Sequence, residues 1–131
     1  MTGVCFLVAG ATAARLAAAE FTLAWNHSVE RVRWEERYRV AGAQLELVEA
    51  SVEGMGAGME PGPDARLIAG RWRWRPAIPA QDELRLAASA YTTDYEICAA
   101  GRCTALRTLV QPANAEVVVV RPCDAPGAGE R

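Results

Sequence analysis

The stretch VERVRWEERYRV, Val29 to Val40, alternates between two kinds of side chain along its whole length. One set consists of arginines together with Glu35, and the other consists of valines and aromatic residues together with Glu36. A helix would scatter both sets around its circumference, whereas a strand places them on opposite faces. The stretch therefore predicts a β-strand with one charged face and one largely apolar face.

The same alternation continues on both sides of this stretch. EFTLAWN, Glu20–Asn26, precedes it, and AQLELVEASVE, Ala43–Glu53, follows it after the turn residue Gly42. Further short runs are RWRWRP, ELRLAAS, TDYEICA, RCTALRTL and EVVVV, and ELRLAAS could instead form a short helix. Many short strands separated by turn signals predict an all-β fold, a small antiparallel β-sandwich or barrel of about eight or nine strands.

Composition limits the kinds of protein that this chain can be. Its 131 residues are 51% hydrophobic, which suits one domain with its own core. We expect this domain to span residues 1–123, with a disordered tail at 124–131, where the sequence is DAPGAGER. The net charge of −2 gives no field that would attract nucleic acid, so no nucleic-acid partner is expected. No apolar run is long enough to predict a membrane-spanning helix.

The beginning of the chain has two interpretations. VCFLVAGATAARLAAA, residues 4–19, could be a secretory signal or a first β-hairpin that turns at Gly10. Since no basic residue precedes the apolar run and Arg15 interrupts its end, the hairpin is favoured. The sequence thus offers no convincing signal peptide.

Four cysteines bear on the same question. Cys98 and Cys103 bracket the short turn AAGR, so they could face each other within disulfide reach, and Cys5 would then pair with Cys123. Two disulfides would favour a periplasmic location. The alternative is four reduced thiols packed as small hydrophobic side chains. No metal site is expected, because there is no C-x-x-C pair and the single histidine lies far from the cysteines.

Polar residues gather where the EFTLAWN strand ends. His27, Ser28 and Glu30 supply hydrogen-bond donors and acceptors close together, and strand ends often carry binding sites. They could equally cap a turn. Glu36 would share the apolar face of its strand, so its carboxylate needs a partner there or its pKa rises. An internal ion pair with an arginine, a place at the margin of the core and a role in ligand binding are the alternatives.

Two further segments complete the candidate ligand- or partner-binding site. Gly56, Gly58 and Met59 belong to GMGAGM, whose glycines permit close backbone approach, although the spacing is not that of a phosphate-binding loop. Arg73 and Arg75 alternate with tryptophans in RWRWRP and could bind an anion. The competing interpretation of the arginine-rich strand faces is a solvated surface or cross-strand salt bridges.

Taken together these motifs resemble a known bacterial family. FTLAWNHSVERVRWEERYRV, EGMGAGMEP, RWRWRPAIP, the C-x4-C pair and the final V-x-R-P-C occur in the order found in the domain of unknown function 1850 family. The resemblance runs from about Val4 to Cys123, and its most specific parts are His27–Glu30 and Gly56–Pro61. One departure is Asn26, where the family pattern suggests threonine or a similar polar residue.

The resemblance implies a role but no established activity. Genes of this family often lie beside those for tripartite (TRAP) transporters with a TAXI-class solute-binding protein. It therefore implies a non-enzymatic accessory or binding module in solute uptake, with the transporter membrane subunit, its solute-binding protein or an anionic small molecule as partner, and no cofactor. The alternatives are a small hydrolase or lyase that uses His27 with Glu30 or Glu36, and a purely structural interaction domain.

Overall fold

The structure, a computed structural model, describes residues 2–26, 32–53, 64–88, 94–110 and 115–124. Within these ranges it contains eleven strands and one short helix. The elements are β1 (Thr2–Val8), β2 (Ala11–Leu16), β3 (Glu20–Asn26), β4 (Arg33–Ala41), β5 (Gln44–Glu53), β6 (Arg66–Ile68), β7 (Arg71–Trp74), β8 (Leu84–Ala87), β9 (Glu96–Ala99), β10 (Arg102–Ala105), α1 (Leu106–Leu109) and β11 (Val117–Asp124).

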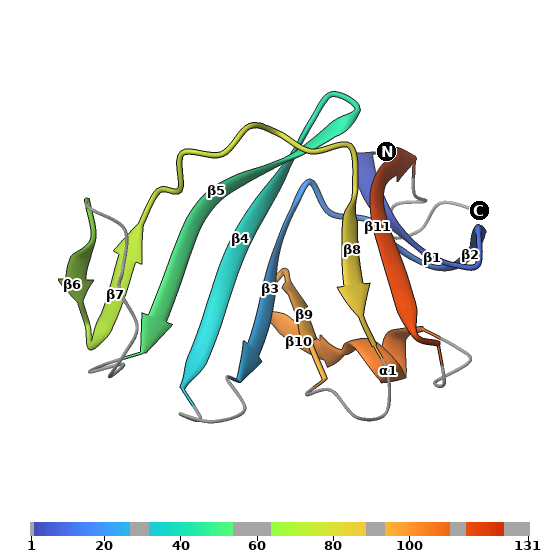
Figure 1. The fold of residues 1–131 in the computed structure, drawn as a ribbon. Coiled ribbons are helices and arrows are strands. Elements are labelled where there is room, and N and C mark those ends of the chain that lie inside the picture. Colours follow the sequence, from blue (N-terminus) through green and yellow to red (C-terminus); the bar gives the residue numbers. More distant parts are fainter. Residues whose placement is uncertain (1, 27–31, 54–63, 89–93, 111–114, 125–131) are drawn as a thin grey trace.

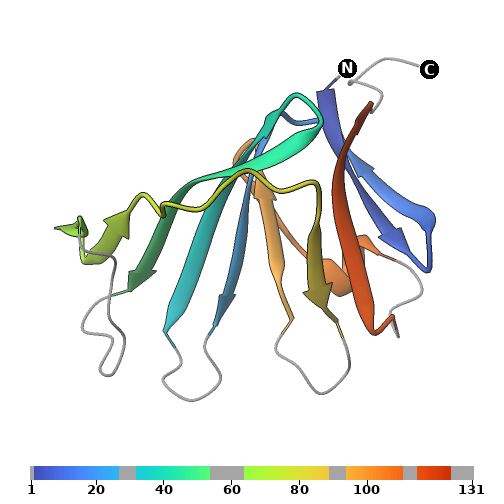
Figure 2. The same cartoon turned by 45° about the horizontal axis from the view of Figure 1, so that its top comes forward.

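The strands form two antiparallel sheets. The first has the order β2-β1-β11-β8, and the second has the order β10-β9-β3-β4-β5-β7-β6. Figures 1 and 2 show that the strands fan out along an open arc, with β6 at one end and the β1–β2 hairpin at the other. This arrangement confirms the predicted all-β class and is that of a sandwich of two sheets, not a closed barrel.

The core lies between the two sheets. The four-stranded sheet contributes Phe6, Leu84 and Val120, and the seven-stranded sheet contributes Phe21 and Tyr38, whose rings stack with centroids 5.5 Å apart. The single turn of α1 adds Leu106, which is fully buried. Burial of these side chains is the main stabilising contribution, at about 1.5–3 kcal/mol for each large one.

Strand β4 has the two faces that its sequence predicts. Tyr38 points to the inner face, toward the core, whereas Arg37 and Arg39 are exposed on the outer face. A β-bulge between Arg37 and Tyr38 shifts the register with β5. The neighbouring strands have the same two faces. Glu36 is opposite Ala50, and Ala50 is opposite Trp74. Directly paired residues point to the same side of a sheet, so all three lie on the inner face.

The predicted count of eight or nine strands is too low. The described residues form eleven strands. One that lies in none of the predicted runs is β6, which forms a hairpin with β7 through Ala69 and Gly70, both at positive φ. Three exposed residues give β6 little alternation to detect. RCTALRTL, predicted as one strand, divides into β10 and α1, and ELRLAAS contributes strand β8, not a helix.

The beginning of the chain forms the expected hairpin. Strands β1 and β2 pair antiparallel, and the turn between them holds Ala9 and Gly10 at positive φ. Disulfides join Cys5 to Cys123 and Cys98 to Cys103, the two pairs that the sequence favours. The first bond links the first described strand to the last, since β1 also pairs with β11. Among the described residues, no helix has the length and apolarity that crossing a membrane requires.

The two disulfides should differ in their contribution to stability. Cys5–Cys123 closes a loop of 118 residues, whereas Cys98–Cys103 spans five. Chain-entropy arguments give losses of about 4–5 kcal/mol for Cys5→Ala with Cys123→Ala, and about 2 kcal/mol for Cys98→Ala with Cys103→Ala. Urea unfolding of both double variants beside the oxidised protein measures the difference. Equal losses in the two variants would contradict this account of how the first and last strands are held together.

Candidate functional site

The structure describes only part of the predicted site. Glu36, Arg73 and Arg75 lie within the described ranges. The other predicted residues, His27, Ser28, Glu30, Gly56, Gly58 and Met59, lie outside the described residues. The site can therefore be built from the strands that bracket these motifs and from the arginines near them.

Both motif segments leave from one end of the seven-stranded sheet. Residues 27–31 connect β3 to β4, and Asn26 is opposite Arg33 across that pair of strands. Residues 54–63 follow Glu53, the last residue of β5. Val52, just before Glu53, is opposite Trp34 at the beginning of β4. The HSVE and GMGAGM motifs are thus anchored on adjacent strands at the same end.

Arg33 ties this end of the sheet together. Its Nη1 donates to Glu96 of β9 at 2.5 Å, and its Nε donates to Glu35 at 2.9 Å. Its backbone N–H donates to the Glu53 carboxylate at 2.7 Å. Partial burial lowers the pKa of Arg33, but the hydrogen bonds to Glu35 and Glu96 outweigh this and raise it overall. One arginine therefore joins three strands where the first motif segment ends.

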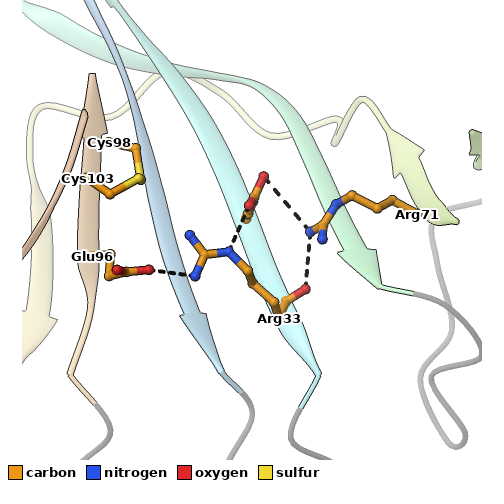
Figure 3. The surroundings of a disulfide bond; sticks show 6 residues. Arg33, Arg71, Glu96, Cys98 and Cys103 are labelled. Atoms are coloured by element: carbon orange, nitrogen blue, oxygen red, sulfur yellow. Dashed lines mark hydrogen bonds and ion pairs between the residues drawn. A yellow bond between two sulfur atoms is a disulfide. The ribbon is translucent and has the colours of Figure 1, made fainter. Parts of the chain in front are cut away.

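Arg71 extends this network to β7. Its Nη2 donates to the backbone oxygen of Arg33 at 3.2 Å and to the buried hydroxyl of Ser51 at 3.1 Å, and it lies 3.9 Å from Glu35. Figure 3 shows Arg33 with Glu96 on one side and Arg71 on the other. The network explains why Ser51 can be buried within an otherwise apolar strand segment.

The remaining arginines of the outer face of β4 and β7 are also paired. Arg37 bonds Glu20 at 3.1 Å, Arg39 bonds Glu46 at 2.8 Å, and Arg73 bonds Glu49 at 3.1 Å. Cross-strand salt bridges therefore occupy the arginine-rich face, which was one of the two interpretations of the sequence. Most of its positive charge is neutralised within the sheet.

A hollow of about 420 Å³ lies at the β6–β7 end of the sheet. Arg66, Arg73 and Arg75 line it together with Glu49, Asp64 and Trp74, and we call it the arginine hollow. Asp64 follows directly after the glycine segment and accepts a hydrogen bond from the backbone N–H of Arg75 at 3.4 Å. Among the described residues, the side chains of Arg66 and Arg75 make no ion pair.

Aromatic side chains cover the inner face near the end that carries the motifs. Trp25 stacks on Trp34 with ring centroids 6.3 Å apart, and Trp34 meets Trp74 edge-on at 6.0 Å. Tyr95, just before β9, packs edge-on against Trp25 at 5.7 Å. The buried Nε1 of Trp34 has no hydrogen-bond partner within the described part of the chain. These rings continue the core from β9 across to β7.

Glu36 lies among these inner-face side chains. Its Oε1 accepts a hydrogen bond from the Tyr38 hydroxyl at 2.9 Å, so its partner is a phenol and not an arginine. Burial raises the pKa of the Glu36 carboxyl, and the hydrogen bond from Tyr38 offsets only part of the rise. Burial, followed by the neighbouring Glu36 charge, raises the pKa of Tyr38 as well. The pair forms a polar position within a mostly apolar face.

Glu36 and Arg73 do not form one site. Pairing places Glu36 on the inner face and Arg73, opposite Ser51 and bonded to Glu49, on the outer face. Arg66 and the cross-strand role of Arg33 were missed from the sequence. The hairpin sequence RLIAGRW, with its Ala-Gly turn, could have indicated Arg66, whereas no local pattern pairs Arg33 with Glu96, 63 residues away. Among the described residues, no cluster of three potential ligands could hold a metal ion.

Comparisons with known proteins give one result. The family model described as Domain of unknown function (DUF1850) matches residues 21–106. This range begins in β3 and ends at α1, so it contains the seven-stranded sheet except Glu20, and also β8. It is narrower than the resemblance from Val4 to Cys123. No curated protein and no solved structure matches the chain.

Replacing Arg33 should weaken the fold more than replacing a surface arginine. Arg33→Gln removes charge-assisted bonds to two strands, whereas Arg37→Gln removes one exposed pair. We expect Arg33→Gln to lower the free energy of unfolding by about 1–2 kcal/mol more than the control. Chemical denaturation of both variants measures this difference. If both variants lose the same amount, the network does not hold the end of the sheet together.

Glu36 should make stability depend on pH. Because burial raises its pKa above the usual value in the folded protein, its favourable contribution is complete below that usual value and is lost as pH rises through the raised pKa. Glu36→Gln, which can still accept the Tyr38 bond, should therefore unfold at a higher temperature than wild type near pH 7.5. The difference should shrink toward zero near pH 4. Thermal melts across this range would reject the account if wild type were the more stable at neutral pH.

Proposed function

This chain belongs to the DUF1850 family, and on that premise we propose that it is a non-enzymatic accessory module of a TAXI-type tripartite transporter. In this role it binds a carboxylate in the arginine hollow. The carboxylate belongs either to a small organic solute or to an acidic side chain of a transporter subunit. The link to transport comes from the family resemblance, because genes of this family often lie beside those for such transporters.

The arginine hollow is the observation that carries the proposal. Elsewhere on the outer face of β4 and β7, each arginine is paired with a glutamate of the same sheet. In the hollow, Arg66 and Arg75 contribute guanidinium groups that make no ion pair among the described residues. A guanidinium group that has no ion-pair partner among the described residues is available to an anion from outside.

The chemistry of the lining suits a carboxylate. A guanidinium group presents two parallel N–H donors, which match the two oxygens of a carboxylate. Ile68, which shares the outer face with Arg66 and is exposed, adds an apolar side chain beside the arginines. The volume, about 420 Å³, falls within the range of small-molecule sites. The hollow therefore offers charge, hydrogen bonds and one apolar wall to a small organic acid or an acidic side chain.

The position of the hollow connects it to a family motif. Residues 54–63, which contain GMGAGM, run from Glu53 at the end of β5 to Asp64 in the lining of the hollow. Glycines permit the close backbone approach that a bound ligand or partner requires.

The described lining supports binding in preference to catalysis. Glu49 is bonded to Arg73, and Asp64 accepts the N–H of Arg75, so both carboxylates already take part in positioning the arginines. General acid–base catalysis needs a group that is poised to exchange a proton with a substrate. The hollow instead presents fixed positive charge.

Capture from the native host tests the proposal. The tagged chain is purified with its partners, and transporter subunits are quantified by mass spectrometry for wild type, for Arg66→Gln with Arg75→Gln, and for Arg85→Gln with Arg121→Gln. The last pair is a matched control, because it removes the same charge from the other sheet, where both arginines pair with Glu83. We expect the hollow variant to lose capture by at least about tenfold and the control to keep it.

Two outcomes would contradict the proposal. Absence of any transporter subunit from the wild-type sample would remove the accessory role. Equal capture by all three proteins would remove the hollow as the site. A further variant, His27→Ala with Glu30→Ala, separates the two parts of the proposal: loss of capture only in that variant would move the binding site to the HSVE segment while keeping the accessory role.

A further inference from the structure

The two disulfides lie in different surroundings. Cys5, in β1, is 6% exposed, and its partner Cys123, in β11, is half-buried. Cys103 is exposed, and Cys98 directly opposite it in the β9–β10 hairpin is half-buried. Thiol–disulfide exchange requires that a thiolate reach a sulfur atom of the bond. Cys103 is therefore the most accessible of the four cysteines, so a thiolate reaches the Cys98–Cys103 bond more readily than the Cys5–Cys123 bond.

A second hollow, also of about 420 Å³, lies beside the accessible bond. Both cysteines line it, together with the turn residues Ala100 and Gly101 and with Arg37 and Arg102. Arg37 is paired with Glu20, whereas Arg102 makes no ion pair among the described residues. Positive charge near a sulfur stabilises the thiolate that leaves during exchange.

The hairpin does not depend on the disulfide for its position. Its turn is formed by Ala100 and Gly101 at positive φ, and Cys98 is opposite Thr22 of β3 in the sheet. Glu96, two residues before Cys98 on the same face, is held by Arg33. Figure 3 shows the disulfide above this ion pair on the same side of the sheet. Opening the bond would thus leave two thiols facing each other on an ordered hairpin.

From these observations we infer that Cys98–Cys103 is a thiol–disulfide exchange site for a dithiol protein, and that Cys103 is the sulfur attacked. The partner thiolate attacks Cys103 Sγ and forms a mixed disulfide, and Cys98 Sγ leaves as a thiolate that takes a proton from water. The second thiolate of the partner then attacks the partner sulfur that is bonded to Cys103, and a disulfide forms within the partner. Cys103 is released as a thiolate and is protonated, so two electrons pass from the dithiol to this chain.

Selective reduction tests the first part of this inference. The oxidised full chain is treated with dithiothreitol under native conditions, quenched with acid, alkylated and analysed by peptide mass spectrometry. We expect Cys98 and Cys103 to be alkylated at least about tenfold faster than Cys5 and Cys123, with an unchanged far-ultraviolet circular dichroism spectrum. Equal rates for both bonds, or reduction of Cys98–Cys103 only in denaturant, would overturn the inference.

A mixed-disulfide trap tests the direction of attack and the class of partner. The probe is a thioredoxin whose second active-site cysteine is replaced, so that the covalent intermediate persists. With the oxidised wild-type chain we expect an adduct on Cys103, and Cys98→Ala with Cys103→Ala should form none. An adduct on Cys98, on Cys5 or on Cys123, or no adduct with wild type, would contradict the proposed reaction.

Discussion

Cross-strand pairing of arginine with glutamate is the interaction on which the outer face of the seven-stranded sheet and the charge of its hollow depend. Arg33 shows it most fully, because its bonds to Glu35, Glu96 and Glu53 join β4 to β9 and β5. Single exposed ion pairs contribute little to stability, but a half-buried network that spans several strands fixes their relative positions. It also neutralises a face that would otherwise repel itself.

The two faces of the sheet carry different kinds of side chain. The inner face supplies apolar and aromatic side chains to the core and extends it through the tryptophans, with Glu36 bonded to Tyr38 as a polar exception. The outer face carries the ion pairs, and near β6 and β7 it opens into the arginine hollow. Among the described residues, the arginines of β4 and β7 pair with glutamates of the same sheet, so Arg66 and Arg75 are what distinguish the hollow on this surface.

Much of the fold was predictable from the sequence, because alternation between polar and apolar residues is a local signal. The stretch Val29–Val40 indicated the two faces of β4, and the AAGR turn indicated the hairpin that brings Cys98 opposite Cys103. Strand β6 was missed, since three exposed residues produce almost no pattern. The turn of α1 follows β10 directly and takes its stability from buried Leu106, which is a tertiary contact that local pattern does not reveal.

The site was less predictable, because register and tertiary contacts, which local sequence patterns do not reveal, bring its side chains together. Arg73 and Arg75 could be named from RWRWRP, but the face to which Arg73 points depends on its register with Ser51, and the contribution of Arg66 depends on a hairpin. The most direct test of the account is a titration of the isotopically labelled chain with succinate, followed by amide chemical shifts. The account predicts saturable shifts at Arg66, Arg73 and Arg75 and none at Arg33, Arg37 and Arg39. Equal shifts along the whole outer face, or none in the hollow, would contradict it.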